Sequence, residues 1–202
     1  EMARDVHVHD EKNRKEDLDF VVSEITRMTE MVNDILDYSQ FQAGYLPLKI
    51  DEYNLYEVIE SEVLNCEKAA YENNLTLRCE TDCMDYPVRI DALKMMQVIR
   101  NLVYNAINHT ANGETITVKV SKNMDGVRVS VINPGDPIPP EHLAHLFERF
   151  YRADASRGEK SGFGLGLAIA DTIAREHKGA LKAESDTAST RFTFTMPLRK
   201  QA

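Results

Sequence analysis

A row of three asparagines in RNLVYNAINHT, residues 100–110, is the first group of side chains that could do chemistry. Asn101, Asn105 and Asn108 are four and three residues apart, so they share one face of a predicted helix. Asparagine is a poor helix former, so three of them on one face call for a reason. Their amide oxygens suit a hard cation such as Mg²⁺, which takes phosphate oxygens as further ligands. A solvated polar face explains the same pattern equally well.

Three glycines alternate with other residues in SGFGLGLAIA, residues 161–170. Gly162, Gly164 and Gly166 lead into an apolar periodic stretch that predicts a helix over about 164–177. Glycines at a helix start let backbone N–H groups approach phosphate oxygens. The spacing matches neither the dinucleotide fingerprint nor the P-loop. Taken alone, an ordinary glycine-rich turn is the simpler interpretation.

The stretch VINPGDPIPP, residues 131–140, places a polar side chain where a predicted strand ends. Asn133 closes the strand, and Gly135 and Ile138 follow in the turn. A side-chain amide at a strand end can read the edge of a nucleotide base. Alone, however, this stretch is better explained as a structural Pro/Gly turn.

The stretch LFERFYRAD, residues 146–154, carries two aromatic side chains followed by basic ones. A helix is predicted near 140–148, and Phe147 and Phe150 are three apart, as on one face of a short helix, so we expect them to be core anchors. Arg152, Arg157 and Lys160 follow in a polar segment. That segment either closes over phosphates or is a solvated loop.

The elements that must position these residues divide into two parts. Residues 18–43 have apolar side chains at three-four spacing and predict one long amphipathic helix. No other segment resembles a companion helix of that length, so the apolar stripe needs a partner outside it, in a missing helix or a second copy. We predict a helical part over residues 1–44 and a second domain over 45–202.

The second domain mixes helices with alternating strands. Asn54 and Asp91 can each cap a helix, and TITVKV and VRVSVI alternate as strands around a turn at Asp125-Gly126. Helices and mostly antiparallel strands in this order predict an α+β fold, a two-layer α/β sandwich with helices on one face of a sheet.

The composition excludes several classes of protein. The net charge is −9, which argues against nucleic-acid and anionic-membrane binding. The three cysteines form no C-x-x-C pair, so neither a disulfide framework nor a zinc site is predicted, and a reducing cytoplasm fits best. No apolar run is long enough to span a membrane.

The order of these stretches is more specific than any one of them. An asparagine-rich helix, a polar strand end with glycine, a paired-Phe helix, a polar segment and a glycine loop opening a helix resemble the ATP-binding domain of sensor histidine kinases, the Bergerat fold. The resemblance covers about residues 48–198. The preceding helix, ending ILDYSQFQAG, resembles the second helix of the family's dimerisation and phosphotransfer hairpin.

The resemblance implies a site for ATP and Mg²⁺. NLVYNAINHT is similar to the N box, in which Asn105 would coordinate Mg²⁺ and Asn101 would line the same site. NPGDPIP is similar to the first glycine box, LFERFYR to the F box and GFGLGL to the second glycine box. The implied ATP-binding residues are Asn101, Asn105, Asn108, His109, Asn133, Gly135, Ile138, Arg152, Lys160, Gly162, Phe163, Gly164, Leu165, Gly166 and Leu167.

Several positions depart from the family pattern. Asn133 stands where Asp is usual, so a bond to the adenine amino group would lose its charge assistance. Pro137 replaces a common Gly and stiffens the turn. Asn108 stands where a phosphate-contacting Lys is frequent, and His109 where an aromatic residue is frequent.

The resemblance implies transfer of the γ-phosphoryl group of ATP to a histidine, and from there to an aspartate of a response regulator. It also implies a homodimer through the helical hairpin, and a cytoplasmic portion of a bacterial protein whose missing N-terminal part is membrane-anchored. The alternative is a nucleotide-binding regulatory module without phosphotransfer. A plain coiled-coil dimerisation protein would leave the three glycines unexplained.

His9, in HDEKN, imitates the phosphoacceptor motif of the family. Arg14 stands where Pro is usual, and residues 10–17 are all polar or charged, which does not suit a bundle helix starting at His9. Only 35 residues separate His9 from Gly44, too few for two long helices. We therefore expect the acceptor to lie upstream of Glu1, and this fragment to bind ATP without phosphorylating itself.

Overall fold

The computed structural model contains two compact units, Glu1–Gly44 and Tyr45–Ala202. The described residues are 14, 15, 18, 20–22, 24, 25, 28, 29, 32, 35, 36, 39, 48–124, 126–152 and 164–197. Within them, no helix is long and apolar enough to cross a membrane.

The described residues of the first unit are helical and carry exposed apolar side chains. The side chains of Leu18, Val21, Ile25, Met28, Val32, Ile35 and Leu36 are between 41% and 64% exposed. They recur at the spacing that the sequence pattern predicted for one helical stripe. An exposed stripe of this length is unusual for a monomeric surface, which normally scatters its large apolar residues.

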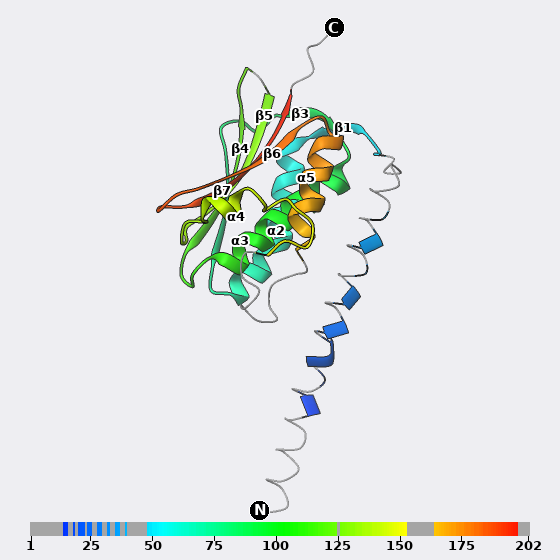
Figure 1. The fold of residues 1–202 in the computed structure, drawn as a ribbon. Helices are drawn as coiled ribbons and strands as arrows, with labels where there is room; N and C mark the ends of the chain where they lie inside the picture. Colours follow the sequence, from blue (N-terminus) through cyan, green and yellow to red (C-terminus); the bar gives the residue numbers. More distant parts are fainter. Residues whose placement is uncertain are drawn as a thin grey trace, which may run out of the picture. The chain divides into compact units, whose positions relative to one another are not determined.

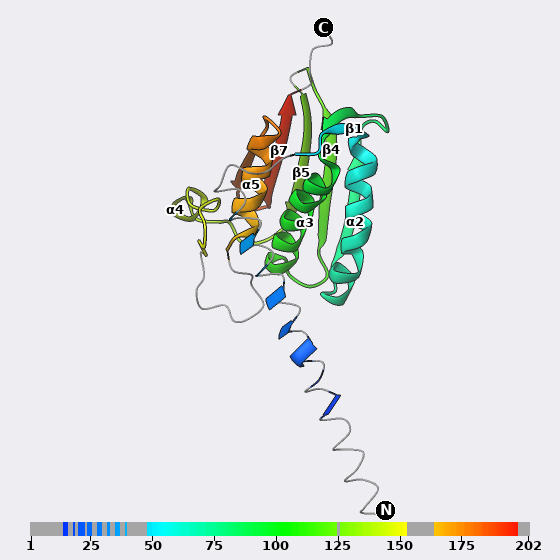
Figure 2. The same ribbon diagram turned by 90° about the vertical axis from the view of Figure 1, so that its right-hand side faces the viewer.

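The second unit is a two-layer sandwich. Its five-stranded sheet has the order β2-β4-β5-β7-β6, with β2 parallel to β4 and the other neighbours antiparallel. The strands are β2 (Thr76–Thr81), β4 (Thr115–Lys122), β5 (Gly126–Asn133), β6 (Ala180–Ser185) and β7 (Thr190–Pro197). Helices α2 (Leu55–Glu72), α3 (Ala92–His109) and α5 (Gly166–Glu176) cover one face (Figures 1 and 2).

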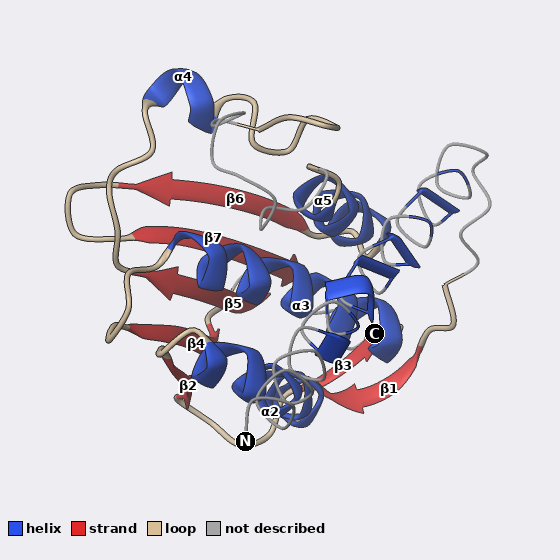
Figure 3. Ribbon diagram, turned by 90° about the horizontal axis from the view of Figure 1, so that it is seen from below, coloured by secondary structure: helices blue, strands red, loops and turns tan. Residues whose placement is uncertain are grey.

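The core lies between these helices and the sheet because the strands alternate in polarity. Val118 faces Val131 across β4 and β5, and Val129 faces Phe194 across β5 and β7. All four side chains are fully buried. The other face of the sheet carries mostly polar residues, as expected for a sheet with one solvated side. Figure 3 shows the strands lying as one layer beside the helices.

Three smaller elements complete the unit. β1 (Asp51–Asn54) pairs antiparallel with β3 (Pro87–Ile90), a strand that the sequence pattern did not predict. α4 spans only Pro140–Leu143, so the helix predicted near 140–148 was too long. Beyond it, the N–H groups of His145 and Glu148 bond to carbonyls three residues back, which makes turns instead of an α-helix.

Both predicted helix caps are confirmed. The side chain of Asn54 accepts a hydrogen bond from the N–H of Tyr56, and that of Asp91 accepts one from Lys94. Asp91 also accepts from the N–H of Lys49, and its own N–H donates to Nε2 of His177 at 3.1 Å. The start of α3 is therefore tied to the end of α5.

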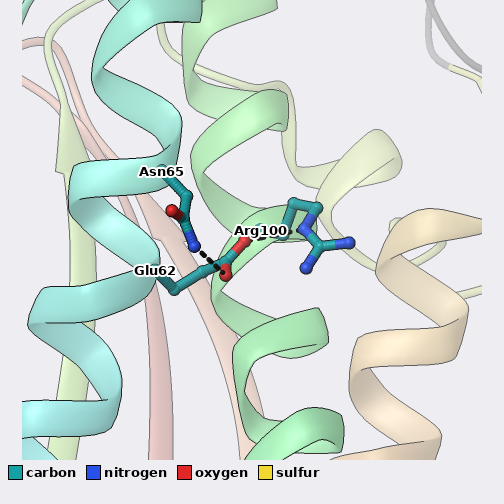
Figure 4. Close-up of polar contacts among 3 residues, drawn as sticks. All are labelled: Glu62, Asn65 and Arg100. Carbon is teal, nitrogen blue, oxygen red and sulfur yellow. Dashed lines mark hydrogen bonds and ion pairs between the residues drawn. The ribbon is translucent and has the colours of Figure 1, made fainter.

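A polar cluster joins α2 to α3 (Figure 4). Glu62 is 1% exposed, and its Oε1 accepts a hydrogen bond from Nε of Arg100 at 2.7 Å. Nδ2 of Asn65 donates to the other carboxylate oxygen at 3.3 Å. The bond to Glu62 raises the pKa of Arg100 above its ordinary value. Arg100 precedes Asn101, so the cluster also holds the helix that carries the asparagines.

Replacing Arg100 by Met should lower the free energy of unfolding by about 1–3 kcal/mol, because a buried carboxylate loses its main partner. Lys68→Met is the matched control, since the Lys68–Glu72 contact is 3.8 Å long and exposed. Urea unfolding measures both. Equal effects of the two substitutions would show that the Glu62 contact contributes nothing.

The thiols of Cys66 and Cys79 should make the free energy of unfolding depend on pH in the alkaline range. Burial raises the pKa of Cys66 and of Cys79 from 9.0 to about 11. Between these values the unfolded chain loses its thiol protons and the folded chain keeps them. The free energy of unfolding should therefore fall as pH rises from about 9 to about 11.

Urea unfolding across this pH range tests the effect. Cys66→Ala should flatten the fall, whatever it does to stability at neutral pH, because one thiol titration is removed. Cys83 is exposed and serves as the control position. An unchanged slope in Cys66→Ala, matching that of Cys83→Ala, would exclude the thiol as a cause.

Candidate functional site

The predicted asparagine face is present on α3. Asn101 and Asn105 are partly buried, whereas Asn108 and His109 are exposed at the end of the helix. Nδ2 of Asn101 donates to the carbonyl of Gly166 at 2.9 Å, so this side chain joins α3 to the first residue of α5. The Asn105 side chain has no hydrogen-bond partner among the residues that the structure describes, so its amide is available for a ligand.

The backbone of the glycine-rich stretch lies close to the backbone of residues 150 and 151 at Gly164. Gly164 has φ +74°, and an added Cβ would lie 2.8 Å from the carbonyl oxygen of Tyr151. The carbonyl of Gly164 accepts a hydrogen bond from the N–H of Phe150 at 3.0 Å. Gly164 therefore cannot be replaced without moving the backbone. Gly162, Phe163 and Lys160 lie outside the described residues.

Helix α5 begins directly after this glycine. Leu165 precedes the helix with its side chain buried, and Gly166 and Leu167 form the first turn. Among the described residues, neither a capping side chain nor an acidic residue occupies this turn. The first N–H groups of a helix lack internal partners and carry the positive end of its dipole. The start of α5 therefore suits an anion such as a phosphate group.

Asn133 stands at the end of β5, as predicted, and is 3% exposed. Its Nδ2 donates to the carbonyl of Pro134 at 3.3 Å. Its Oδ1 is a buried side-chain acceptor without a partner among the described residues. Buried polar atoms are nearly always paired, so this one needs a donor that the described chain does not supply.

The turn after Asn133 is held from two sides. A Cβ on Gly135 would lie 3.2 Å from the carbonyl oxygen of His109, so this turn runs close to the end of α3. The N–H of Ile138 donates to Oγ of Ser185 at 3.0 Å, and Ser185 contacts the hydroxyl of Thr190 at 2.7 Å. Thr190 is the β7 partner of Asn133.

Sequence reasoning missed Ser185 and Thr190, which hold this side of the site. Each looks like an ordinary polar residue of an alternating strand. Their role depends on strand pairing, and no local signal in the sequence points to it.

The two phenylalanines behave differently. Phe147 packs edge-on against Phe192 of the core, with ring centroids 6.4 Å apart, which confirms it as an anchor. Phe150 is 62% exposed and has φ +59°, so its prediction as a core residue was wrong. The helix ends before Phe150, and the backbone reverses there to meet Gly164. Arg152 is exposed, and Arg157 lies outside the described residues.

The described residues contain no group of three His, Cys, Asp or Glu side chains able to hold a metal ion. His142 contacts the hydroxyl of Tyr151 at 2.6 Å, and His145 contacts Glu148 at 2.7 Å, so each has a local partner. A cation at this site would depend on amide oxygens and phosphate oxygens, which is the chemistry of Mg²⁺.

A hollow of about 270 Å³ lies elsewhere, on the open face of the sheet, lined in part by Lys119, Arg128 and Arg191. Two of these bases have an acid directly across the neighbouring strand: Lys119 is opposite Glu80, and Arg191 opposite Glu184. Such cross-strand pairing is typical of a solvated sheet face. The convergent polar groups are at α3, β5 and α5 instead.

Residues 90–200 match the family described as histidine kinase-, DNA gyrase B-, and HSP90-like ATPase. The sensor histidine kinase CusS of Escherichia coli K12 is 39% identical over 87% of this chain and 36% of its own length. The sensor histidine kinase TrcS of Mycobacterium tuberculosis is 35% identical over 90% of this chain and 36% of its own. The chain thus spans about a third of these curated relatives.

Solved structures show the same architecture. The catalytic domain of the histidine kinase ThkA has a TM-score of 0.66 at 32% identity, covering 74% of this chain and 95% of that domain. ThkA in complex with the response regulator protein TrrA has a TM-score of 0.69 at 30% identity, covering 88% and 49%. These likenesses and the observed layers confirm the predicted α+β sandwich of the Bergerat type.

Two glycines with similar backbone angles allow a matched test of the turn before α5. Gly113 has φ +87° and nothing within 4 Å of an added Cβ, whereas Gly164 has two backbone neighbours under 3.0 Å. Gly113→Ala should cost about 1 kcal/mol for the left-handed backbone alone. Gly164→Ala should cost clearly more in urea unfolding. Equal losses would mean that the turn relaxes without strain.

Proposed function

This chain belongs to the histidine kinase-, DNA gyrase B- and HSP90-like ATPase family, and we propose that it binds ATP with Mg²⁺ between α3, the end of β5 and the start of α5. The observation that carries the proposal is the hydrogen bond between Asn101 and Gly166. It brings an asparagine-bearing helix against an uncapped helix start. Amide oxygens that could hold a cation would then lie near N–H groups that could bind phosphates.

Different residues would contact the metal ion and the phosphate groups of the nucleotide. Asn105 would hold Mg²⁺, which neutralises charge on the phosphate oxygens as the phosphoryl group is transferred. The N–H groups at the start of α5 would bind phosphate oxygens, and Gly162, Gly164 and Gly166 would let the backbone approach them. The hydrogen bond from Asn101 to Gly166 would keep the distance between Asn105 and the start of α5 fixed. Asn108, His109, Arg152 and Lys160 would contribute polar groups at the outer side.

The base would bind beside Asn133. The unpartnered Oδ1 of Asn133 can accept a hydrogen bond from the exocyclic amino group of adenine. Gly135 and Ile138 would bound the base on the side of the turn, which the Ser185 and Thr190 hydroxyls hold in place. The acceptor lies within the buried end of β5, where a hydrogen bond is stronger than in water.

In the longer protein, the γ-phosphoryl group would pass to a histidine and then to an aspartate of a response regulator. The support is that the relatives are sensor histidine kinases and that ThkA was solved with a response regulator. The exposed apolar stripe of the first unit would pair with a second copy to form a homodimer. His9 lies outside the described residues, and its exclusion as acceptor stays a prediction.

A nucleotide-binding regulatory module without phosphotransfer is the second candidate. This second candidate is favoured by three positions, the neutral amide of Asn133, the stiff Pro137 and the uncharged Asn108. Each removes a charge or a freedom that the usual family pattern provides. Labelled ATP distinguishes the two candidates in the full-length protein. Acid-labile phosphohistidine supports the kinase, and its absence with intact ATP binding supports the module.

Titration calorimetry with Mg-ATP tests the shared premise. Asn105→Ala should weaken Mg-ATP binding at least about tenfold, because a cation ligand is lost. Removing Mg²⁺ should weaken binding to the unmodified protein and have much less effect on the variant. Asn123→Ala, in the turn between β4 and β5 at the opposite end of β5 from Asn133, is the matched control and should bind normally. If Mg-ATP shows no saturable binding to the unmodified protein, the proposal is refuted.

A further inference from the structure

We propose that Asn133 allows this site to accept 6-oxopurine nucleotides, those of guanine and hypoxanthine, as well as adenine nucleotides. The inference rests on the proposed nucleotide binding and specifies which bases the site takes. It starts from one buried atom, Oδ1 of Asn133, which has no partner among the described residues although its side chain is 3% exposed.

A buried acceptor without a donor costs roughly 1–3 kcal/mol, so its presence points to a ligand that supplies the donor. The side chain is well placed to meet one. Asn133 ends β5, its β7 neighbour is Thr190, and the following turn is bonded to Ser185. The backbone that carries the amide is thus held on two sides, so the amide can move only through the torsions of its own side chain.

The rotation matters because an amide carries an acceptor and a donor on one planar group of nearly symmetric shape. Turning it by about 180° exchanges Oδ1 and Nδ2 without changing its volume. Among the described residues, one hydrogen bond fixes the present orientation, from Nδ2 to the Pro134 carbonyl at 3.3 Å. That length is beyond the usual range for an N–H···O bond, so breaking it costs little. The turned amide would place Oδ1 beside the Pro134 carbonyl oxygen, a repulsion that the bond from Nδ2 to a 6-oxopurine has to offset.

The two orientations match two kinds of purine. Adenine presents a donor at position 6, its amino group, and guanine presents an acceptor, its carbonyl oxygen. Oδ1 facing the base pairs with the first, and Nδ2 facing the base pairs with the second. A carboxylate at position 133 would offer only acceptors. It would bind adenine with charge assistance and oppose the carbonyl oxygen of a 6-oxopurine.

Position 133 is therefore a specificity-determining residue, and asparagine there relaxes the choice of base. The competing explanation is that Asn133 only closes the strand, with water as its missing donor. In that case the two purine classes would be distinguished, if at all, by other groups. Exchanging the amide for a carboxylate would then leave the ratio of their affinities unchanged.

The test is titration calorimetry of the purified chain with Mg-ATP, Mg-GTP and Mg-ITP. ITP carries the 6-oxo group without the 2-amino group of GTP, so it isolates position 6. The unmodified protein should bind ATP and ITP with affinities within about tenfold of each other. Asn133→Asp should shift the preference toward ATP over ITP by about tenfold or more, the usual discrimination of one base contact.

Asn133→Ala provides a second route if a buried carboxylate prevents folding, which circular dichroism would reveal. Loss of the amide should weaken ATP and ITP by similar factors. Asn123→Asp is the control and should change neither affinity, because Asn123 lies in the turn before β5, at the opposite end of that strand from Asn133, and aspartate keeps the Oδ1 that accepts from the Gly126 N–H.

The outcomes separate the inference from the proposed function. Binding of ATP with more than about 100-fold rejection of ITP overturns the inference and leaves ATP binding intact. An unchanged ATP-to-ITP ratio in a folded Asn133→Asp variant also overturns it. Failure of all three nucleotides to bind overturns the proposed function and the inference together.

Discussion

The antiparallel attachment of α3 to α5 is the constraint on which the site depends. Asn101 donates to Gly166 at the start of α5, and the Asp91 N–H donates to His177 at its end. Apolar packing between two helices tolerates sliding, whereas hydrogen bonds at both ends fix their register. Nδ1 of His177 contacts the Ile173 carbonyl, so the ring donates at one nitrogen and accepts at the other. The asparagine face of α3 and the start of α5 thereby stay at a constant distance.

The residues beside the site store backbone strain. Phe150 and Gly164 both have positive φ, and the Phe150 N–H bonds to the Gly164 carbonyl. A bulky residue in the left-handed region costs about 1–3 kcal/mol and persists only where its surroundings enforce it. Here the exposed side chain of Phe150 gains little from burial, so the enforcing contact is the backbone bond to Gly164. The strain thus serves to bring the chain back to the start of α5.

The sequence predicted those features that depend on local chemistry. The caps at Asn54 and Asp91, the asparagine face and the alternating strands all follow from neighbours a few residues apart. Features that depend on distant pairing were missed. Strand β3 alternates in burial but is only four residues long, too short for the pattern to stand out, and its partner β1 lies on the other side of α2 in the sequence. Ser185 and Thr190 acquire their roles only when β6 and β7 lie beside β5. Phe150 was misplaced because the spacing to Phe147 cannot show where a helix stops.

A neutral amide at the end of β5 changes the balance between folding and binding. Burying a carboxylate there would cost several kcal/mol unless it were paired, whereas an unpaired amide oxygen costs less. The free protein is therefore more stable with Asn133 than with an unpaired acid. A complex with adenine at this position would forgo a charge-assisted hydrogen bond. Selectivity would be lost along with the charge, because a fixed negative group facing the site is what excludes a ligand that presents an acceptor.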